Sequence, residues 1–328
     1  MIVKELSLLE CLFELGFGLP PLGNFMVRSA LKKDGTVLGA CLNEGDTARC
    51  VGLAVVNSGK ALTIDYVFVP EEYRGRGYGT KLVAAATTLA KEREAVGVRA
   101  RAVMGDPSGE VFAQILERNG FEVYDRARLV SFADDDRTRT AWQEFVQDRA
   151  GRICAKLKDR GYWTVSFADA SPEVLQHFQE DVKQHFPPHL NPNIFLNNRE
   201  HRLAADHSFI ALKGDECAAY TLVTTIDGKT LSFQQLSASR KHQRSGAFLL
   251  PVVATVETAF AKRQYKLMSA MVYDSNENMN RLVDGFIAPL ATSIKTQRFY
   301  RLLFQEHLPR QECHGEGCQH ESCCTSSM

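Results

Sequence analysis

The residues best suited to chemistry lie in one glycine-rich segment between an apolar run, Tyr66 to Val69, and a stretch rich in Ala, Leu, Lys and Glu, Thr80 to Glu94. The segment consists of Arg74, Gly75, Arg76, Gly77, Tyr78, Gly79 and Thr80. A turn that leads from a strand into a helix presents the unpaired N–H groups and the positive partial charge of the first helical turn. Glycines let this backbone approach a ligand, and Arg74 and Arg76 add positive charge. The segment therefore predicts a diphosphate site.

Two common phosphate-binding motifs do not fit this segment. The strands before it follow one another as a meander, whereas a dinucleotide fingerprint needs a strand–helix–strand unit. A Walker loop would end in Gly-Lys-Ser/Thr, which the segment lacks. The structural alternative is an ordinary glycine turn between a strand and a helix.

The segment resembles the acyl-CoA-binding motif Arg/Gln-x-x-Gly-x-Gly/Ala of the GNAT superfamily of N-acyltransferases, with Arg74, Gly77 and Gly79 at the fixed positions. The residues before it, Val67, Phe68 and Val69, resemble the bulged strand whose backbone pairs with the pantetheine arm in that family. Residues 112–121, ending in Gly-Phe, resemble the next helix of the family. The resemblance covers roughly residues 40–132.

The second half of the chain resembles the same family more weakly. Gln243 and Gly246 keep two fixed positions of the motif, but Phe248 stands where glycine or alanine is expected. Residues 278–300 resemble the C-terminal signature of the family in a shortened form. The resemblance implies a tandem protein with an intact first motif and a degenerate second one.

The order of the elements supports this duplication. Alternating apolar residues and turn-forming pieces predict an antiparallel meander over 25–69, followed by a helix over 80–94, a strand over 97–104, a helix from Ser108 and a final strand over 121–132. A similar order recurs from Trp163 to Phe304. The expected fold class is α/β, with two GNAT-like domains, each a mixed, mostly antiparallel sheet flanked by helices.

The expected domain boundaries follow from the same pattern. We expect a first domain at 1–134 with the intact motif, a helical linker at 135–160 and a second, degenerate domain at 161–308. Residues 309–328 form a Cys/His-rich tail that we expect to be disordered, because it is short, polar and terminal. Its cysteine spacing is not a paired Cys-x-x-Cys repeat, and we expect no metal.

Catalytic side chains are harder to choose from the sequence. Acylation needs a neutral amine, so a base should take a proton, and Asp65 and Glu72 are the candidates near the acyl site. Many GNAT members place a tyrosine four residues before the Gly of Gly-Phe, where this chain has Leu116, and Tyr124 is the substitute. Backbone N–H groups of a bulge at Val67–Val69 could polarise the thioester carbonyl. The structural alternatives are a strand-end acid, a surface acid and a core tyrosine.

The composition indicates which partners and which cellular compartment to expect. The formal net charge is zero, so no global field would recruit nucleic acid or an anionic membrane. No stretch reaches the roughly 18 apolar residues of a membrane span, and the apolar run Leu6–Phe17 is interrupted by Glu10 and Glu14. The chain has nine cysteines, and those in apolar segments are interpreted as small buried hydrophobes in a reducing compartment. We therefore expect a cytoplasmic protein.

The resemblance implies an acyl-CoA-dependent N-acetyltransferase that moves an acetyl group from acetyl-CoA, a co-substrate, to a primary amine by direct attack. Its partners would be acyl-CoA and the amine acceptor, without nucleic acid or membrane, and its oligomeric state stays open. Two alternatives remain: a non-catalytic CoA-binding sensor or interaction module, and an acetyltransferase that acts on a protein lysine or N-terminus. A fold does not fix a substrate.

Overall fold

The computed structural model describes residues 2–7, 10, 19–44, 47–187, 190–196, 203–225 and 228–304. The chain divides into two compact units. The first unit contains the chain up to Ala102, Val111–Tyr124 and the residues from Phe299 on. The second contains Val103–Glu110 and Asp125–Arg298. Each unit is thus built from separate stretches of the chain. The domain boundaries that the sequence predicts at 134, 160 and 308 describe the sequence repeat, and they stay a prediction.

The first unit has a mixed sheet in the order β1-β2-β3-β4-β5-β12. Strands β2, β3 and β4 form the predicted antiparallel meander, β1 pairs at its edge, and β5 runs parallel to β4. The predicted start of the meander at residue 25 was wrong, because Phe25–Val27 lie in a helix that begins at Pro21, a residue suited to the first helical position. The strands are β1 (Ile2–Glu5), β2 (Thr36–Glu44), β3 (Thr47–Asn57), β4 (Leu62–Phe68), β5 (Gly97–Val103) and the end of β12 (Ser293–Leu303), and the helices are α2 (Pro21–Leu31), α3 (Tyr78–Glu92) and most of α4 (Pro107–Arg118).

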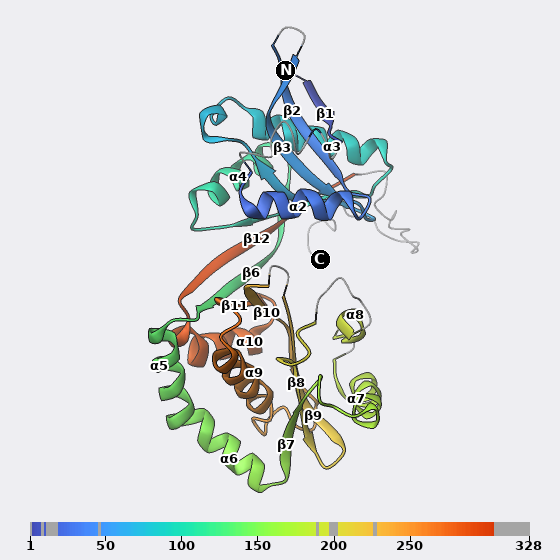
Figure 1. Cartoon of the computed structure of the whole chain (residues 1–328). Coiled ribbons are helices and arrows are strands. Elements are labelled where there is room, and N and C mark those ends of the chain that lie inside the picture. Colours follow the sequence, from blue (N-terminus) through green and yellow to red (C-terminus); the bar gives the residue numbers. More distant parts are fainter. Residues whose placement is uncertain are drawn as a thin grey trace, which may run out of the picture. The chain divides into compact units, whose positions relative to one another are not determined.

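Two helices cover opposite faces of this sheet (Figure 1). Leu53 and Val55 of β3 pack in one core cluster with Val27 of α2. Gly52, which precedes Leu53 in β3, faces the opposite side of the sheet. A Cβ added there would lie 3.5 Å from Leu82 Cδ1 of α3. Because successive residues of a strand point to opposite faces of the sheet, α2 covers one face and α3 covers the other.

The second unit has a sheet in the order β12-β6-β11-β10-β9-β8-β7. The meander β8-β9-β10 with β11 parallel to β10 repeats the arrangement of β2-β3-β4 with β5. Its strands are β6 (Glu122–Ala133), β7 (Tyr162–Ser166), β8 (Phe209–Lys213), β9 (Glu216–Thr224), β10 (Thr230–Ala238) and β11 (Leu267–Tyr273), and its helices are α5 (Asp136–Phe145), α6 (Gly151–Asp159), α7 (Pro172–His185), α8 (Asn193–Leu196), α9 (Leu249–Lys262) and α10 (Glu277–Leu282).

Short irregular turns extend two of these helices. A π-helical turn, Val146–Ala150, joins α5 to α6, so the stretch 136–159 is helical as the sequence predicts. Its apolar side packs within the second unit, where Trp142 and Leu157 are buried. Another π turn, Val283–Ile287, and a 3-10 turn, Ala288–Leu290, continue α10. Whether 135–160 acts as a linker stays a prediction.

Each sheet is completed by a strand from the other half of the sequence. In the first unit the end of β12 follows β5, and the Phe304 N–H donates to the Val96 carbonyl at 3.1 Å. In the second unit β6 runs antiparallel along β11, with pairs from Leu267↔Ala133 to Tyr273↔Ala127. The last strand of each repeat is therefore exchanged.

The cysteines divide into two kinds. Cys41 and Cys50 face each other on β2 and β3 and are joined by a disulfide, which corrects the expectation that both are simply small buried hydrophobes. Cys154 and Cys217 are free and buried, as expected. The Cys/His-rich tail at 309–328 and most of the run Leu6–Phe17 lie outside the described residues.

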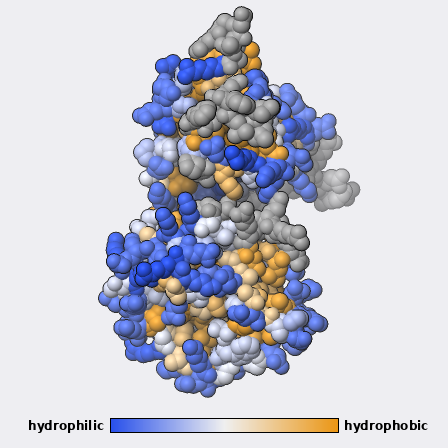
Figure 2. All heavy atoms as spheres, in the orientation of Figure 1, coloured by the Kyte–Doolittle hydropathy of each residue, from blue (hydrophilic) through white to orange (hydrophobic). Residues whose placement is uncertain are grey.

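On the face drawn in Figure 2, hydrophilic residues predominate and hydrophobic ones lie between them. Within the part of the chain that the structure describes, no helix is both long and apolar enough to cross a bilayer. No group of three or more His, Cys, Asp or Glu side chains suited to a metal ion occurs among those residues either.

The exchanged strand should carry part of the stability of the first unit. Tyr300 of β12 is fully buried, and its hydroxyl donates to Glu117 Oε1 of α4 at 3.0 Å. We expect Tyr300→Ala to lower the free energy of unfolding by about 3–5 kcal/mol, as for other buried aromatic truncations. Urea denaturation measures this loss. Leu303→Ala, at a side chain that is 37% exposed in the same strand, is the control and should change little. Equal effects would contradict the packing role.

Candidate functional site

The candidate site begins where two neighbouring strands part. Parallel pairing between β4 and β5 covers Leu62↔Val98 to Ile64↔Ala100. From there β4 continues to Phe68 along β3, and the described residues give its other edge no further partner on β5. The backbone groups along that edge, from Tyr66 to Phe68, are therefore available to a ligand.

A β-bulge marks the point of parting, but not where the sequence suggested. The register between β3 and β4 shifts between Val55↔Tyr66 and Val56↔Ile64, so the extra residue is Asp65. Val67 and Phe68 pair regularly with β3, and Val69 lies just beyond the strand. The expectation of a bulge at Val67–Val69 was wrong, because the chain inserts its extra residue where β4 leaves β5.

The glycine-rich loop after β4 has the geometry of an anion cradle. A 3-10 turn, Glu71–Tyr73, leads into it, and the Arg74 Nε donates to the Val69 carbonyl at 3.0 Å. Gly75 and Gly77 have φ of 76° and 79°, in the left-handed region that favours glycine. Helix α3 then begins at Tyr78.

The first N–H groups of α3 are unpaired. The Lys81 N–H donates to Gly77 O at 3.1 Å, whereas no hydrogen bond within the described residues uses the N–H groups of Gly77, Tyr78, Gly79 or Thr80. Gly79 also permits close helix packing, since a Cβ there would lie 3.0 Å from Ile115 Cδ1 of α4. The helix end thus offers both donors and a positive dipole end to an anion.

Arginines from two elements surround this helix end. The guanidinium groups of Arg49, from β3, and Arg76, from the loop, each lie 5.7 Å from the centroid of the Tyr73 ring. Arg74 is exposed beside them. Arg49 was missed from the sequence, because a single arginine in a strand carries no local signal. Together these cations and the free N–H groups suit a diphosphate.

The predicted catalytic candidates lie in different surroundings. Asp65 is half-buried in the bulge and accepts a hydrogen bond from Asn57 Nδ2. Glu72 is exposed in the 3-10 turn before the loop. Tyr124 is 40% exposed on β6, and its described contacts are with Phe299 and Arg301 rather than with the loop. The structure therefore groups Asp65 and Glu72 with the loop and its strand, but gives no such contact for Tyr124.

Two further residues bear on proton transfer. Leu116 is fully buried in α4, so the position that carries a tyrosine in many GNAT proteins is a core position here. Tyr66, which the sequence did not single out, precedes Val67 on β4, and burial raises the pKa of its hydroxyl. A Cβ added to Gly23 of α2 would lie 3.0 Å from the Tyr66 Oη, so this tyrosine packs under α2.

The corresponding loop of the second unit is closed on itself. The His242 N–H donates to Ser239 O, the Ser245 N–H to His242 O, and the Ala247 N–H to Ser245 Oγ. The Leu249 N–H, the first of α9, donates to Gly246 O at 3.0 Å. Two of the donors that a phosphate would need at this helix start, the Ala247 and Leu249 N–H groups, are therefore already used, which agrees with the degeneracy predicted from Phe248.

This geometry can be compared with known proteins. Residues 7–107 match the Acetyltransferase (GNAT) family, and no curated protein sequence matches the chain. A tandem GNAT protein from the clavulanic acid biosynthesis pathway superposes with a TM-score of 0.60 at 15% identity, covering 92% of this chain and 98% of that one. A GCN5-related N-acetyltransferase from Sphaerobacter thermophilus gives a TM-score of 0.60 at 13% identity, covering 92% and 95%.

One similar structure is much longer than this chain. It is described as a GCN5-related glucosamine N-acetyltransferase region of a fungal multi-domain GH3 β-N-acetylglucosaminidase, with a TM-score of 0.62 at 12% identity. This chain aligns over 92% of its own length and spans 38% of that protein.

The fold and the family match define a GNAT acetyltransferase domain at residues 7–107. The chain as a whole has the α/β fold of two GNAT-like domains in tandem, which confirms the fold class predicted from the sequence. Proteins of this family typically use an acyl-CoA.

The closed loop generates a prediction about pH. Burial lowers the pKa of His242 below its ordinary value of 6.5, although the neighbouring Glu216 carboxylate opposes this. Its Nδ1 lies 2.8 Å from the Tyr162 hydroxyl. Below pH 6.5 the imidazole of His242 binds a proton in the unfolded chain but stays neutral in the folded chain until the pH reaches the lower, folded pKa. The free energy of unfolding should therefore fall as the pH drops towards the folded pKa. One proton sets a slope of at most about 1.4 kcal/mol per pH unit.

Urea denaturation of His242→Gln between pH 7.5 and pH 5 tests this, on the order of one pH unit to each side of the ordinary histidine pKa. The variant should lose part of the acid-side slope. His185→Gln, at a histidine whose side chain is 48% exposed, should keep it. The same slope in wild type and His242→Gln would contradict the burial argument.

Proposed function

We propose that the chain is an acyl-CoA-dependent N-acetyltransferase whose first unit transfers an acetyl group from acetyl-CoA to a primary amine. The observation that carries this proposal is the start of α3, where two left-handed glycines and three arginines lie close to N–H groups and a strand edge that have no partner among the described residues. A diphosphate and an extended amide-bearing arm are the two parts of acyl-CoA that such a surface would accept.

The proposed site assigns each part of the cofactor to named groups. The residues Arg74, Gly75, Arg76, Gly77, Tyr78, Gly79 and Thr80 would hold the diphosphate, with Arg49 adding charge. Val67, Phe68 and Val69 would pair with the pantetheine arm through their backbone, since the β5-facing edge of β4 is unpaired there. The thioester would then lie near the bulge at Asp65.

The proposed reaction is a direct displacement. The amine nitrogen attacks the thioester carbonyl carbon, the C–S bond breaks, and the amine loses a proton while the thiolate of CoA gains one. Asp65, beside the strand edge, or Glu72 would take the amine proton, directly or through water. Tyr124 remains the proton donor proposed from the sequence, and Tyr66 is a second candidate because its raised pKa keeps the hydroxyl protonated.

The acceptor is proposed only as a class. Likeness to a region described as a glucosamine N-acetyltransferase makes amino sugars the first primary amines to test. A CoA-binding protein without catalysis is the competing function, and the buried Leu116 in place of a tyrosine favours it.

Cofactor binding can be tested by thermal unfolding with acetyl-CoA. At about a hundred times its dissociation constant, a ligand should stabilise the folded chain by roughly 2.7 kcal/mol and raise the melting temperature. Gly77→Glu should abolish this shift, because its carboxylate and its side chain at φ 79° stand where the diphosphate would bind. Gly161→Glu is a matched control, with φ of 83° and open space around its Cβ.

Three outcomes separate the hypotheses. A shift in the wild type and in Gly161→Glu, but not in Gly77→Glu, supports the first loop. A shift that survives in Gly77→Glu moves the cofactor elsewhere, and the absence of any shift with acetyl-CoA or free CoA rejects cofactor binding altogether.

Catalysis is tested by thiol release from acetyl-CoA in the presence of glucosamine and other primary amines. If Asp65 is the base, Asp65→Asn should lower kcat by about 10²- to 10⁴-fold while acetyl-CoA binding stays unchanged. Glu72→Gln tests the other carboxylate, and Glu71→Gln, next to it and also exposed, is the control. Full activity in both test variants rejects both carboxylates, and binding without thiol release favours the sensor.

A further inference from the structure

The second unit contains a cavity that the proposed function does not use. Its parallel pair also ends early: β10 and β11 pair from Thr230↔Leu267 to Phe233↔Ala270. Beyond Phe233 the register of β10 shifts and the strand follows β9, while β11 follows β6. A cavity of about 330 Å³ opens where the two strands part, which lies in the size range of ligand sites.

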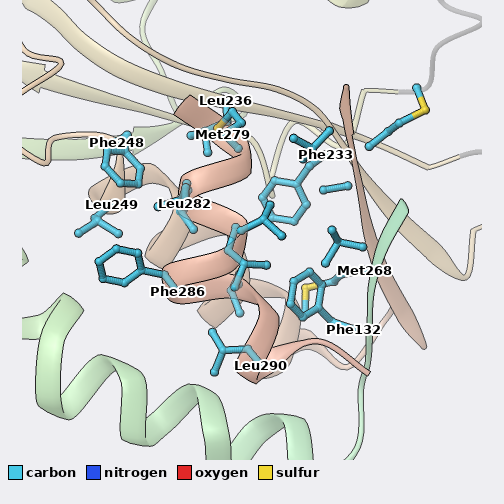
Figure 3. Close-up of a pocket in the computed structure, with 18 of the residues that line it drawn as sticks. Phe132, Phe233, Leu236, Phe248, Leu249, Met268, Met279, Leu282, Phe286 and Leu290 are labelled. Atoms are coloured by element: carbon cyan, nitrogen blue, oxygen red, sulfur yellow. The ribbon is translucent and has the colours of Figure 1, made fainter. Parts of the chain in front are cut away.

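The walls of this cavity come from several elements of the same unit. Figure 3 shows Phe248 and Leu249 at the start of α9, Leu282 and Phe286 on α10 and its π turn, and Phe233 and Met268 on the parted strands, grouped around one space. Each of these side chains is apolar, and several come from positions far apart in the sequence. The lining is therefore a product of the tertiary fold.

The chemistry of the lining excludes a charged group. Among the lining residues that the structure describes, none is Asp, Glu, Lys, Arg or His, and the uncharged polar ones besides Trp142 are Thr138, Gln234, Gln235, Tyr273 and Asn276. Trp142, one of the lining residues, is 8% exposed and its indole Nε1 is buried without a hydrogen-bond partner among the described residues. Burying an ion against such walls is costly, so the part of a ligand that enters must be uncharged.

The cavity is also unsuited to the phosphates of a CoA. At the start of α9 the Ala247 and Leu249 N–H groups donate to the preceding turns, and the Phe248 side chain lines the cavity at a position where the motif needs a glycine or alanine. The second unit thus keeps the parting of its strands but loses the diphosphate cradle.

The cavity reaches the surface and can adapt its shape. Met271, Tyr273 and Phe286 line it and are 38%, 38% and 37% exposed, so they form its rim. Methionines, of which Met268 and Met279 also line it, follow the outline of different apolar ligands because their side chains are flexible. An engineered cavity of about 150 Å³ accepts benzene, so a space twice as large suits a chain of about ten to twelve carbons.

We propose that this cavity is a second binding site, distinct from the acyl-CoA site, which holds an uncharged aliphatic chain of about ten carbons. Each added methylene should raise the affinity about fourfold until the chain fills the space. Flexible apolar walls, an open rim and the missing phosphate cradle all point to a simple hydrocarbon chain rather than to a second cofactor.

The test is displacement of the fluorescent probe N-phenyl-1-naphthylamine from the full chain by linear alcohols of increasing length. The probe should bind, and two added methylenes, as from hexanol to octanol, should lower the displacing concentration about fifteenfold. Ala270→Phe puts a ring into the cavity and should weaken probe and decanol binding at least about tenfold. Ala155→Phe, at an exposed alanine of α6 outside the lining, should bind like the wild type.

A second variant keeps the proposal testable if Ala270→Phe does not fold. Phe248→Ala enlarges the cavity and should move the best alcohol towards longer chains, whatever the fate of Ala270→Phe. Absence of probe binding, displacement that ignores chain length, or undiminished binding in folded Ala270→Phe overturns the proposal. Displacement of the probe from the Gly77→Glu chain by acetyl-CoA, but not by decanol, would also overturn the proposal, because the cavity would then be a cofactor cleft. None of these outcomes depends on acetyl transfer.

Discussion

Parallel pairing between β4 and β5 ends at Ile64↔Ala100, and the extra residue Asp65 shifts the register with which β4 pairs with β3 beyond that point. From Tyr66 on, one edge of β4 has no partner strand among the described residues, and a few residues later α3 begins with N–H groups that are equally unpaired. Backbone groups without internal partners must be satisfied by water or by a ligand. The candidate site is therefore built mainly from backbone, and its side chains adjust charge and access.

The second unit shows what the same parting produces when the loop changes. There β10 and β11 also separate, but the preceding turns accept the Ala247 and Leu249 N–H groups, and Phe248 occupies a position that needs a small residue. The space between the strands is lined mostly by apolar side chains. One architecture thus yields a polar, cationic cradle in one repeat and an apolar cavity in the other, and a few residues around the helix start account for the difference.

Local signals in the sequence were sufficient for the glycine loop, because positive φ at Gly75 and Gly77 leaves glycine as the favoured residue and the helix start follows directly. The same holds for the meander and for the degenerate second loop. Arg49 and the cavity lining could not be predicted, since they depend on strand pairing and on residues brought together by the fold. The bulge was placed too late because its position depends on where β4 leaves its neighbour, and no residue type marks that point.

The exchange of the last strands has a consequence for synthesis. When the ribosome has released the first repeat, the sheet position beside β5 lacks its occupant, because that strand lies at Ser293–Leu303, close to the end of the described chain. This sheet edge would stay open until residues 293–303 are made, and open edges invite pairing with other chains. The nascent protein should therefore depend on protection during translation, and the two repeats cannot be separated into independently folding halves by a single cut.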